Sequence, residues 1–195
     1  MKRALIGDGG HAKEVMFQMG EPNLVRFVGD EYWEGKPNTL PLSNFNPSEY
    51  EVMVAIGDSR FRFDLIHYTL PRFTKYFSFT HPTAIIGDDV EIGEGSFIGA
   101  YSILTSNIKI GNHAILNRAN HIGHDTIIGS HLSMMPGAII SGNCRIYDCV
   151  YIGTNSSIKE KLSIHSLTTI GLNSGVIKSI ETPGIYAGSP AKKIK

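Results

Sequence analysis

Residues 84–99 read AIIGDDVEIGEGSFIG, and the aliphatic residue at the third position of this stretch recurs every six residues. The series runs for sixteen members without a slip: Ile86, Ile92, Ile98, Leu104, Ile110, Leu116, Ile122, Ile128, Met134, Ile140, Ile146, Ile152, Ile158, Ile164, Ile170 and Val176. Glycine follows eight of them: Gly87, Gly93, Gly99, Gly111, Gly123, Gly129, Gly153 and Gly171. A period of six fits neither an amphipathic helix nor a half-buried strand. It predicts a β-helix built of hexapeptide repeats.

Three hexapeptides make one triangular coil of 18 residues, with the aliphatic side chain pointing inward. The residue two positions earlier is usually small or branched, as at Ser96, Ala114 and Thr126, and fills the space beside it. We expect the recurrent glycine at a tight corner that needs a positive φ. Coils stack at the strand spacing of about 4.8 Å, so residues 18 apart lie in one column. The open ends of such a stack need caps.

Composition narrows the classes of function. The 195 residues allow one large or two small domains, and the net charge is zero, which argues against a nucleic-acid or membrane-surface binder. The apolar run at the start is too short for a signal peptide, and no stretch approaches the roughly 20 apolar residues of a membrane span. Cys144 and Cys149 lie inside the repeat, and packing is the expected role of Cys144. A cytoplasmic protein is expected.

The segment before the repeat reads as a small α/β domain. A strand over 2–6 leads into the turn Gly7-Asp8-Gly9-Gly10-His11-Ala12, a helix over 12–19 and a second strand over 24–28. Asp30 and Glu31 follow that strand. This order is similar to a dinucleotide-binding fingerprint: Gly9 and Gly10 let the backbone approach a phosphate, and the acids accept from a ribose hydroxyl.

The same pattern continues to the start of the repeat. A third strand over 52–56 ends in Gly57-Asp58-Ser59, where Asp58 or Ser59 caps a helix running from Arg60 to about Leu70, and residues 73–79 form a fourth strand. Residues 1–78 therefore predict a small Rossmann-like βαβαβ domain, which is too short for a complete dinucleotide domain and suits a mononucleotide. The alternative is a plain structural cap on the β-helix. Residues 79–182 form the β-helix domain, and 183–195 form a closing tail.

Motifs across the whole chain resemble one family. They are Gly7-x-Gly9-Gly10-His11, Ala55-Ile56-Gly57-Asp58, His81-Pro82-x-Ala84, the stretch Asn117 to Asp125, and Gly188-Ser189-Pro190-Ala191-Lys192. In these the chain is similar to the bacterial hexapeptide acyltransferases that include sialic acid O-acetyltransferases and N-acetyltransferases of nucleotide-linked 4-amino sugars. The resemblance implies a left-handed β-helix, a homotrimer, and acetyl-CoA in the groove between neighbouring β-helices. It implies that the N-terminal domain holds the nucleotide of the acceptor.

The resemblance also implies that His124 is the catalytic base and Asp125 its acidic neighbour. An acid that the family pattern can place before the histidine is replaced by Gly123, and a histidine near the thioester is replaced by Ser133. Acetyl transfer to an amine needs a base, and histidine, with an ordinary pKa near 6.5, is suited to accept the proton. Contact between His124 and Asp125 requires a corner, since adjacent residues of extended chain point to opposite faces.

Other residues are candidates for binding. Asn117 at a nearby corner is expected to bind the acetyl carbonyl or the sugar, and His11 and Arg62 are candidate nucleotide or phosphate contacts, with turn structure and helix surface as the alternatives. Gly57 and Asp58 are further candidates for substrate binding. His113 and His131, 18 apart, share one column and are read as solvated. The candidates for coenzyme A are Ser133, Gly153, Gly171, Gly188, Pro190 and Lys192, with Lys178, Lys193 and Lys195 adding charge.

The favoured interpretation is an acetyl-CoA-dependent N-acetyltransferase of a nucleotide-linked 4-amino-4,6-dideoxy sugar, with no metal. O-acetylation of sialic acid or a related sugar is the nearest alternative. A metal-dependent hydratase of the γ-carbonic anhydrase type and a NAD-binding regulator are more remote, because the histidine spacing does not suit the first and the second leaves His124 unexplained.

Overall fold

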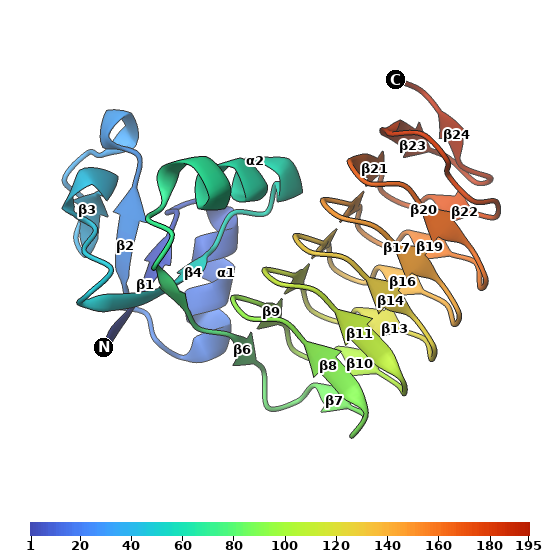
Figure 1. Cartoon of the computed structure of the whole chain (residues 1–195), viewed down its shortest axis with the longest axis horizontal. Coiled ribbons are helices and arrows are strands. Elements are labelled where there is room, and N and C mark those ends of the chain that lie inside the picture. The colour runs from blue at the N-terminus through green and yellow to red at the C-terminus, as the bar shows by residue number, and fades with distance from the viewer.

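A computed structural model describes residues 1–195, and Figure 1 shows an α/β unit lying beside a tapering stack of coils. The α/β unit is formed by the first part of the chain. The chain then winds along the stack, and the C-terminus lies at the end of the stack. No helix combines the length and the apolar character that crossing a bilayer requires.

The N-terminal unit is a five-stranded parallel sheet of order β3-β2-β1-β4-β5. Its strands are β1 (Lys2–Ile6), β2 (Val25–Val28), β3 (Thr39–Pro41), β4 (Tyr50–Val54) and β5 (Lys75–Tyr76). Its helices are α1 (Gly10–Met19), η1 (Asp30–Tyr32), η2 (Leu42–Asn44), α2 (Ser59–Asp64) and the π-helical turn η3 (Leu65–Thr69).

Both faces of this sheet are covered, which is why the buried ends of its two central strands, ALI in β1 and VMV in β4, are continuously apolar. Leu5 and Met53 pack against α1, whereas Ala4, Val52 and Val54 point to the opposite face and pack with Leu70, Leu65 and Ile66. Asp58 is the N-cap of α2, where its carboxylate accepts from the Phe61 N–H (2.8 Å).

The predicted α/β domain is confirmed, with two corrections. The edge strand β3 was missed because it is only three residues long and ends in Pro41, a residue that sheets tolerate at their edges. The strand predicted over 73–79 is wrong. It divides into β5, which belongs to the N-terminal sheet, and β6 (Phe79–Thr80), which pairs with the first coils of the stack.

The stack is a β-helix with three parallel sheets. The first sheet contains β7 (Ile85–Ile86), β10 (Ile103–Leu104), β13 (His121–Ile122), β16 (Ile139–Ile140), β19 (Ser157–Ile158) and β22 (Gly175–Val176). The second contains β8 (Val90–Ile92), β11 (Ile108–Ile110), β14 (Ile127–Ile128), β17 (Arg145–Ile146) and β20 (Ser163–Ile164). The third contains β6, β9 (Phe97–Ile98), β12 (Ile115–Leu116), β15 (Ser133–Met134), β18 (Tyr151–Ile152), β21 (Thr168–Ile170), β23 (Gly184–Ala187) and β24 (Lys192–Lys193).

The 18-residue coil predicted from the sequence is confirmed by the strand register. Leu104 pairs with Ile122 and Ile122 with Ile140, so each inward residue lies on the one 18 positions before it. The aliphatic series is buried from Ile98 to Val176, and only Ile86 and Ile92 at the open end of the stack are partly exposed. At the other end, β23 continues the third sheet and the antiparallel β24 ends it.

The expected role of the repeat glycines is wrong. From Ile92 to Ile170, the positive φ occurs three residues after each inward aliphatic, at Gly95, Tyr101, Asn107, His113, Ala119, Asp125, His131, Gly137, Asn143, Cys149, Asn155, Lys161, Leu167 and Asn173. None of these is β-branched, and nine are Gly, Asn, Asp or His, the types that adopt this conformation most readily.

The glycines directly after the aliphatic residues serve a close approach instead. A Cβ on Gly99, Gly111 or Gly153 would lie 2.6–2.8 Å from the backbone nitrogen of the residue 19 positions later, in the next coil. Glycine is therefore required at these positions by the spacing of the coils.

The two units share a core along the third sheet. Phe97 and Ile115 point outward from this sheet and are buried with Val15 and Met16 of α1. Gln18 of α1 accepts from the Ala100 N–H (2.7 Å). The N-terminal unit thus covers one side of the triangular stack.

Three buried histidines lie in this seam. The rings of His113 and His131 stack 5.2 Å apart, with Tyr76 against the first and Phe63 against the second, so the expectation that they are solvated is wrong. His11 packs edge-on against Phe97. Burial lowers the pKa of His11 and His113 to about 4 and that of His131 to about 3, and Arg62 opposes their protonation further.

We predict that the seam makes the protein acid-labile. Because these pKa values are depressed in the folded state, the unfolded chain binds more protons below pH 6.5, and stability falls as the pH drops from 6.5 towards 4. The melting temperature is expected to fall by at least about 5 °C between pH 7.5 and 5. The variant His131→Phe keeps a ring in the seam but does not titrate, so its melting temperature should depend less on pH. A melting temperature unchanged over this range would contradict the prediction.

Candidate active site

His124 and Asp125 form an exposed pair at a corner of the stack. Their contact requires a corner, and Asp125 has a φ of +57°, which turns its carboxylate back towards the preceding side chain. His124 Nδ1 lies 2.7 Å from Asp125 Oδ2, and the two side chains are 58% and 46% exposed. The hydrogen bonds from His124 and Asn107 lower the pKa of Asp125, so the carboxylate is ionised. Because a carboxylate only accepts, His124 Nδ1 carries the proton and Nε2 is left as the basic atom.

Two residues around this pair were missed from the sequence. Asn107 Nδ2 donates to the other oxygen of Asp125, Oδ1 (2.7 Å). Gly142 lies beneath the imidazole, where a Cβ would come within 2.8 Å of His124 Nε2. Both follow from the coil length, since Asn107 precedes Asp125 by 18 residues and Gly142 follows His124 by 18. Adding or subtracting 18 residues from His124 and Asp125 would have identified both from the sequence.

The corner of His124 lies opposite the N-terminal unit. His124 and Asp125 come between β13 of the first sheet and β14 of the second, whereas the N-terminal unit covers the third sheet. In a triangular coil, the corner between two sides is the one opposite the third side. His124 therefore faces away from the N-terminal unit of its own chain.

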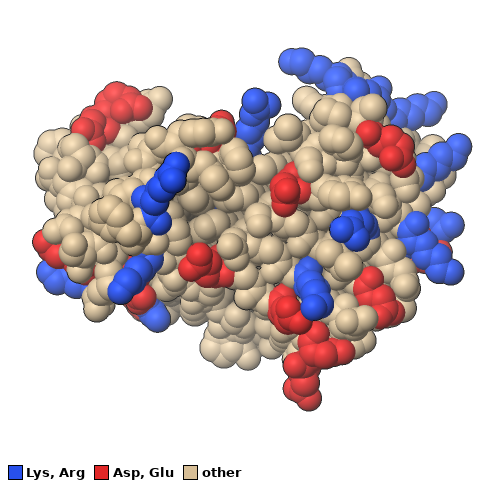
Figure 2. Space-filling model, in the orientation of Figure 1, with Lys and Arg blue, Asp and Glu red and all other residues tan.

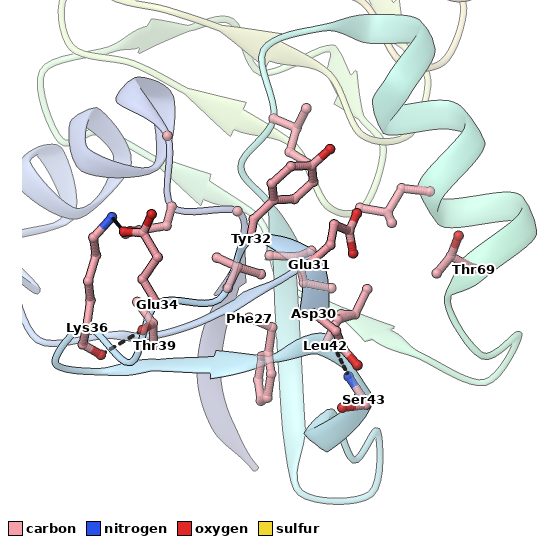
Figure 3. A pocket seen from close by; sticks show the side chains of 18 of the residues that line it. Phe27, Asp30, Glu31, Tyr32, Glu34, Lys36, Thr39, Leu42, Ser43 and Thr69 are labelled. Atoms are coloured by element: carbon pink, nitrogen blue, oxygen red, sulfur yellow. Dashed lines mark hydrogen bonds and ion pairs between the residues drawn. The ribbon is translucent and has the colours of Figure 1, made fainter.

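A cavity of about 810 Å³ opens at the carboxyl ends of β1 and β2 (Figure 3). The predicted residues Gly9, Asp30 and Glu31 line it, together with Tyr32 and Phe61, two aromatic side chains that are largely exposed. The carboxyl edge of a parallel sheet is where ligands bind in open α/β folds.

Most charges of this cavity already have partners. Glu34 pairs with Lys36 (2.7 Å), and Asp8 accepts from the buried Arg26 guanidinium (2.6 Å). Asp30 Oδ1 accepts from the Ser43 N–H (3.0 Å), which lowers the pKa of Asp30. Glu31 makes no hydrogen bond and extends into the cavity in Figure 3. Its two oxygens are available to a ligand.

The glycines of the turn after β1 differ in whether the structure itself requires a glycine at their position. Gly7 has a φ of +112° and its Cβ would lie 3.1 Å from the Ala55 carbonyl, so the turn itself requires glycine. Gly9 and Gly10 have no positive φ, and a Cβ on either would meet nothing within 4 Å. Gly9 is the N-cap of α1, and no side chain caps this helix. Neither packing nor backbone geometry explains Gly9 and Gly10.

The remaining predicted nucleotide residues lie elsewhere. Gly57 and Asp58 line a second hollow of about 620 Å³ between α2 and the third sheet, with Met135, Tyr151 and Thr169. His11 lies in the seam, outside both cavities, as its burial against Phe97 requires.

The expectation that Arg62 contacts a phosphate is wrong, because the residue is buried between the two units. Its side chain is 1% exposed, and its guanidinium donates to the carbonyls of Ile56, His113, His131 and Leu132 and to Ser133 Oγ. Burial lowers its pKa to about 9. The same bonds bury Ser133, which is therefore not open to coenzyme A within this chain. Arg62 joins the two units, and its burial keeps the guanidinium away from any ligand.

Asn117 is also a contact between the units. It is 2% exposed, and its Nδ2 donates to Glu14 Oε2 (2.8 Å) while Oδ1 accepts from the Arg118 N–H. Arg118 reaches the other oxygen of Glu14 (2.9 Å). Burial of Glu14 opposes its ionisation, but these bonds lower its pKa overall. The expected role of Asn117 in binding acetyl or sugar groups is replaced by this interdomain bond.

Positive charge gathers at the C-terminal end of the stack. Residues 150–195 carry six lysines and two glutamates, a net charge of +4, and Figure 2 shows the lysines projecting over the last coils. Gly153 and Gly171 lie against the next turn of chain, and Gly188 has a φ of +96°, so each has a structural reason of its own. No cluster of three or more His, Cys, Asp or Glu side chains could hold a metal ion.

Comparison with known proteins agrees with this architecture. Residues 2–69 match the PglD N-terminal domain family. WeeI from Acinetobacter baumannii AYE is 30% identical, each chain is covered completely, and the TM-score is 0.87. The chain belongs to the hexapeptide acyltransferase family that includes the nucleotide amino-sugar N-acetyltransferases.

Two further similar proteins are named as acetyltransferases. The acetyltransferase domain of PglB from Neisseria gonorrhoeae FA1090, solved in complex with acetyl coenzyme A, is 26% identical over 99% of this chain and 98% of its own, with a TM-score of 0.83. GDP-perosamine N-acetyltransferase of Escherichia coli O157:H7 is 29% identical over 107 residues, which are 55% of this chain. The match spans 48% of that relative's length.

We predict that Arg62 acts on stability. Replacing it in Arg62→Met leaves buried carbonyls unpaired and should cost at least about 3 kcal/mol, which is a fall in melting temperature of roughly 6–12 °C. The exposed Arg72→Met is the control and should melt like the wild type. A variant Arg62→Met of unchanged stability that binds nucleotide weakly would contradict this and restore the phosphate role.

Proposed function

We propose that this chain is an acetyl-CoA-dependent N-acetyltransferase that acts on the amino group of a nucleotide-linked 4-amino-4,6-dideoxy sugar, with His124 as the general base. The exposed His124–Asp125 pair carries the proposal, since its Nε2 is unpaired and its Nδ1 proton is held by an ionised carboxylate. Residues 1–78 hold the acceptor, 79–182 carry out the transfer and 183–195 close the stack.

In the reaction, the sugar nitrogen attacks the thioester carbonyl carbon while His124 Nε2 removes a proton from that nitrogen. The C–S bond then breaks, and the thiolate of coenzyme A takes up the proton to leave as the thiol. Asp125 stabilises the imidazolium that exists between these steps. General-base assistance of this kind is typically worth 10²–10⁴-fold.

The cavity at β1 and β2 supports nucleotide binding. Its volume of about 810 Å³ suits a nucleoside diphosphate sugar, and Gly9 at its edge leaves open space where a side chain would stand. The uncapped N-terminus of α1 offers free N–H groups to a diphosphate. Glu31 supplies acceptors for a ribose hydroxyl or a base N–H.

The position of His124 supports a homotrimer. An acceptor held by the N-terminal unit lies on the covered side of the stack, whereas His124 is at the opposite corner. The acceptor therefore reaches the base of a neighbouring copy, and coenzyme A lies between copies. The lysines of the last coils, with Lys192 and Pro190 in the tail, provide a positive end for its phosphates.

We predict acetylation of one member of a panel of acceptors. Coenzyme A release from acetyl-CoA is measured with UDP-, dTDP- and GDP-4-amino-4,6-dideoxyhexoses and with free sialic acid. His124→Ala should lose at least about 100-fold in kcat, and the exposed His165→Gln should keep full activity. Activity on sialic acid alone would favour O-acetylation, and activity that survives His124→Ala would refute the assigned base.

We predict that substitution of Gly9 mainly weakens nucleotide-sugar binding, whereas substitution of Gly7 mainly lowers the stability of the fold. Gly9→Ala should lose no more than about 1 kcal/mol of stability, because alanine is a poorer N-cap than glycine. It should raise the KM for the nucleotide sugar about tenfold, because its Cβ occupies space that the chain leaves open. Gly7→Ala should instead lose about 1–3 kcal/mol of stability through its backbone conformation. Equal KM values for Gly9→Ala and wild type would contradict a phosphate site at this turn.

A further inference from the structure

The corner that carries Asp125 is repeated in the neighbouring coils, so that residues 18 positions apart stack in one column. Asn107, Asp125, Asn143 and Lys161 occupy equivalent positions in successive coils, with φ values of 51°, 57°, 59° and 62°. Equal backbone conformation projects their side chains in the same direction, one strand spacing apart. Asn107 is thus placed one coil before Asp125, with its amide at the carboxylate.

Asp125 is held from two sides. Its Oδ2 accepts from His124 Nδ1 (2.7 Å), and its Oδ1 accepts from Asn107 Nδ2 (2.7 Å). The Asp125 side chain is 46% exposed, so without a second partner water would compete for it and the carboxylate could rotate away from the ring. Asn107 removes that freedom.

We propose, on the basis of the function assigned above, that Asn107 is a positioning residue for the acetyl transfer: it fixes the carboxylate of Asp125, which in turn holds His124 as the Nδ1–H tautomer with Nε2 facing the substrate. Asn107 touches neither substrate nor the reacting atoms. It acts through Asp125 alone.

Repeat geometry alone does not account for this bond. Asparagine is common at these corners because it tolerates a positive φ, but Asn143, Asn155 and Asn173 have the same conformation and make no side-chain hydrogen bond. Among the corner asparagines, Asn107 pairs with a carboxylate, and that carboxylate belongs to the pair that carries the chemistry. The exposed Asn155 is therefore a matched control for the loss of a corner asparagine.

Three substitutions of Asn107 distinguish positioning from a structural role. Asn107→Ala removes the donor, Asn107→Asp replaces it with a repelling carboxylate of the same shape, and Asn107→Lys supplies a new donor. Lys161 shows that this corner conformation accepts lysine. We expect kcat to fall about tenfold in Asn107→Ala, further in Asn107→Asp, and to recover towards wild type in Asn107→Lys, with KM for acetyl-CoA and acceptor unchanged.

The acidic limb of the kcat/KM profile should move to lower pH in Asn107→Ala by about half a unit or more, since a loosened Asp125 stabilises the imidazolium less. Nitrogen-15 NMR of the imidazole of His124 should report a smaller Nδ1–H fraction. Asn155→Ala should match the wild type in each measurement and should have the same melting temperature as Asn107→Ala.

A kcat for Asn107→Ala within twofold of wild type, with an unchanged pH profile and tautomer, would overturn the proposal. The NMR readout needs no substrate, so it tests the positioning of His124 even if the whole acceptor panel is inert. If His124→Ala stays active while the tautomer responds to Asn107→Ala, the assigned base is wrong and the positioning bond stands.

Discussion

The stacking of one coil on the next, at about 4.8 Å per coil, is the constraint on which the rest of the molecule depends. It requires glycine where a Cβ would strike the backbone of the following coil, as at Gly111 and Gly153, and it repeats a positive φ at successive corners from Gly95 to Asn173. Because the register does not slip, a side chain at one corner always meets the residue 18 positions away. The bond between Asn107 and Asp125 and the stack of His113 on His131 are two results of the same rule.

The second constraint is the desolvation of Arg62. A buried guanidinium with no carboxylate partner is stable here because five neutral oxygens surround it, three of them carbonyls of the β-helix. Burial lowers the pKa of the nearby His113 and His131, which remain neutral, and the charge of Arg62 opposes their protonation further. The two units are held in one arrangement by these contacts, which fixes the direction in which the cavity at β1 and β2 faces.

Periodicity predicted the β-helix, its 18-residue coil and its inward residues, because all three depend on local spacing along the chain. The turn at Gly7 to Ala12 likewise predicted the N-terminal sheet and the cavity edge at Gly9, Asp30 and Glu31. At the candidate site, the errors concern contacts between units. Arg62, Asn117 and His131 are polar residues typical of ligand sites, and nothing in their sequence neighbourhood shows that another part of the chain buries them. The strand β3 was missed for a different reason, its length of three residues.

The arrangement also explains why so small an N-terminal unit suffices. A five-stranded sheet of this size buries one face against α1 and the other against η3, and α1, which lies between the sheet and the stack, completes a core with Phe97 and Ile115 of the β-helix. The stack thus provides the support that a full-sized nucleotide domain would draw from additional strands. The N-terminal unit in turn covers the side of the stack opposite His124, which leaves the corner of His124 and Asp125 exposed. Support of the N-terminal unit and exposure of this corner are therefore consequences of a single interface.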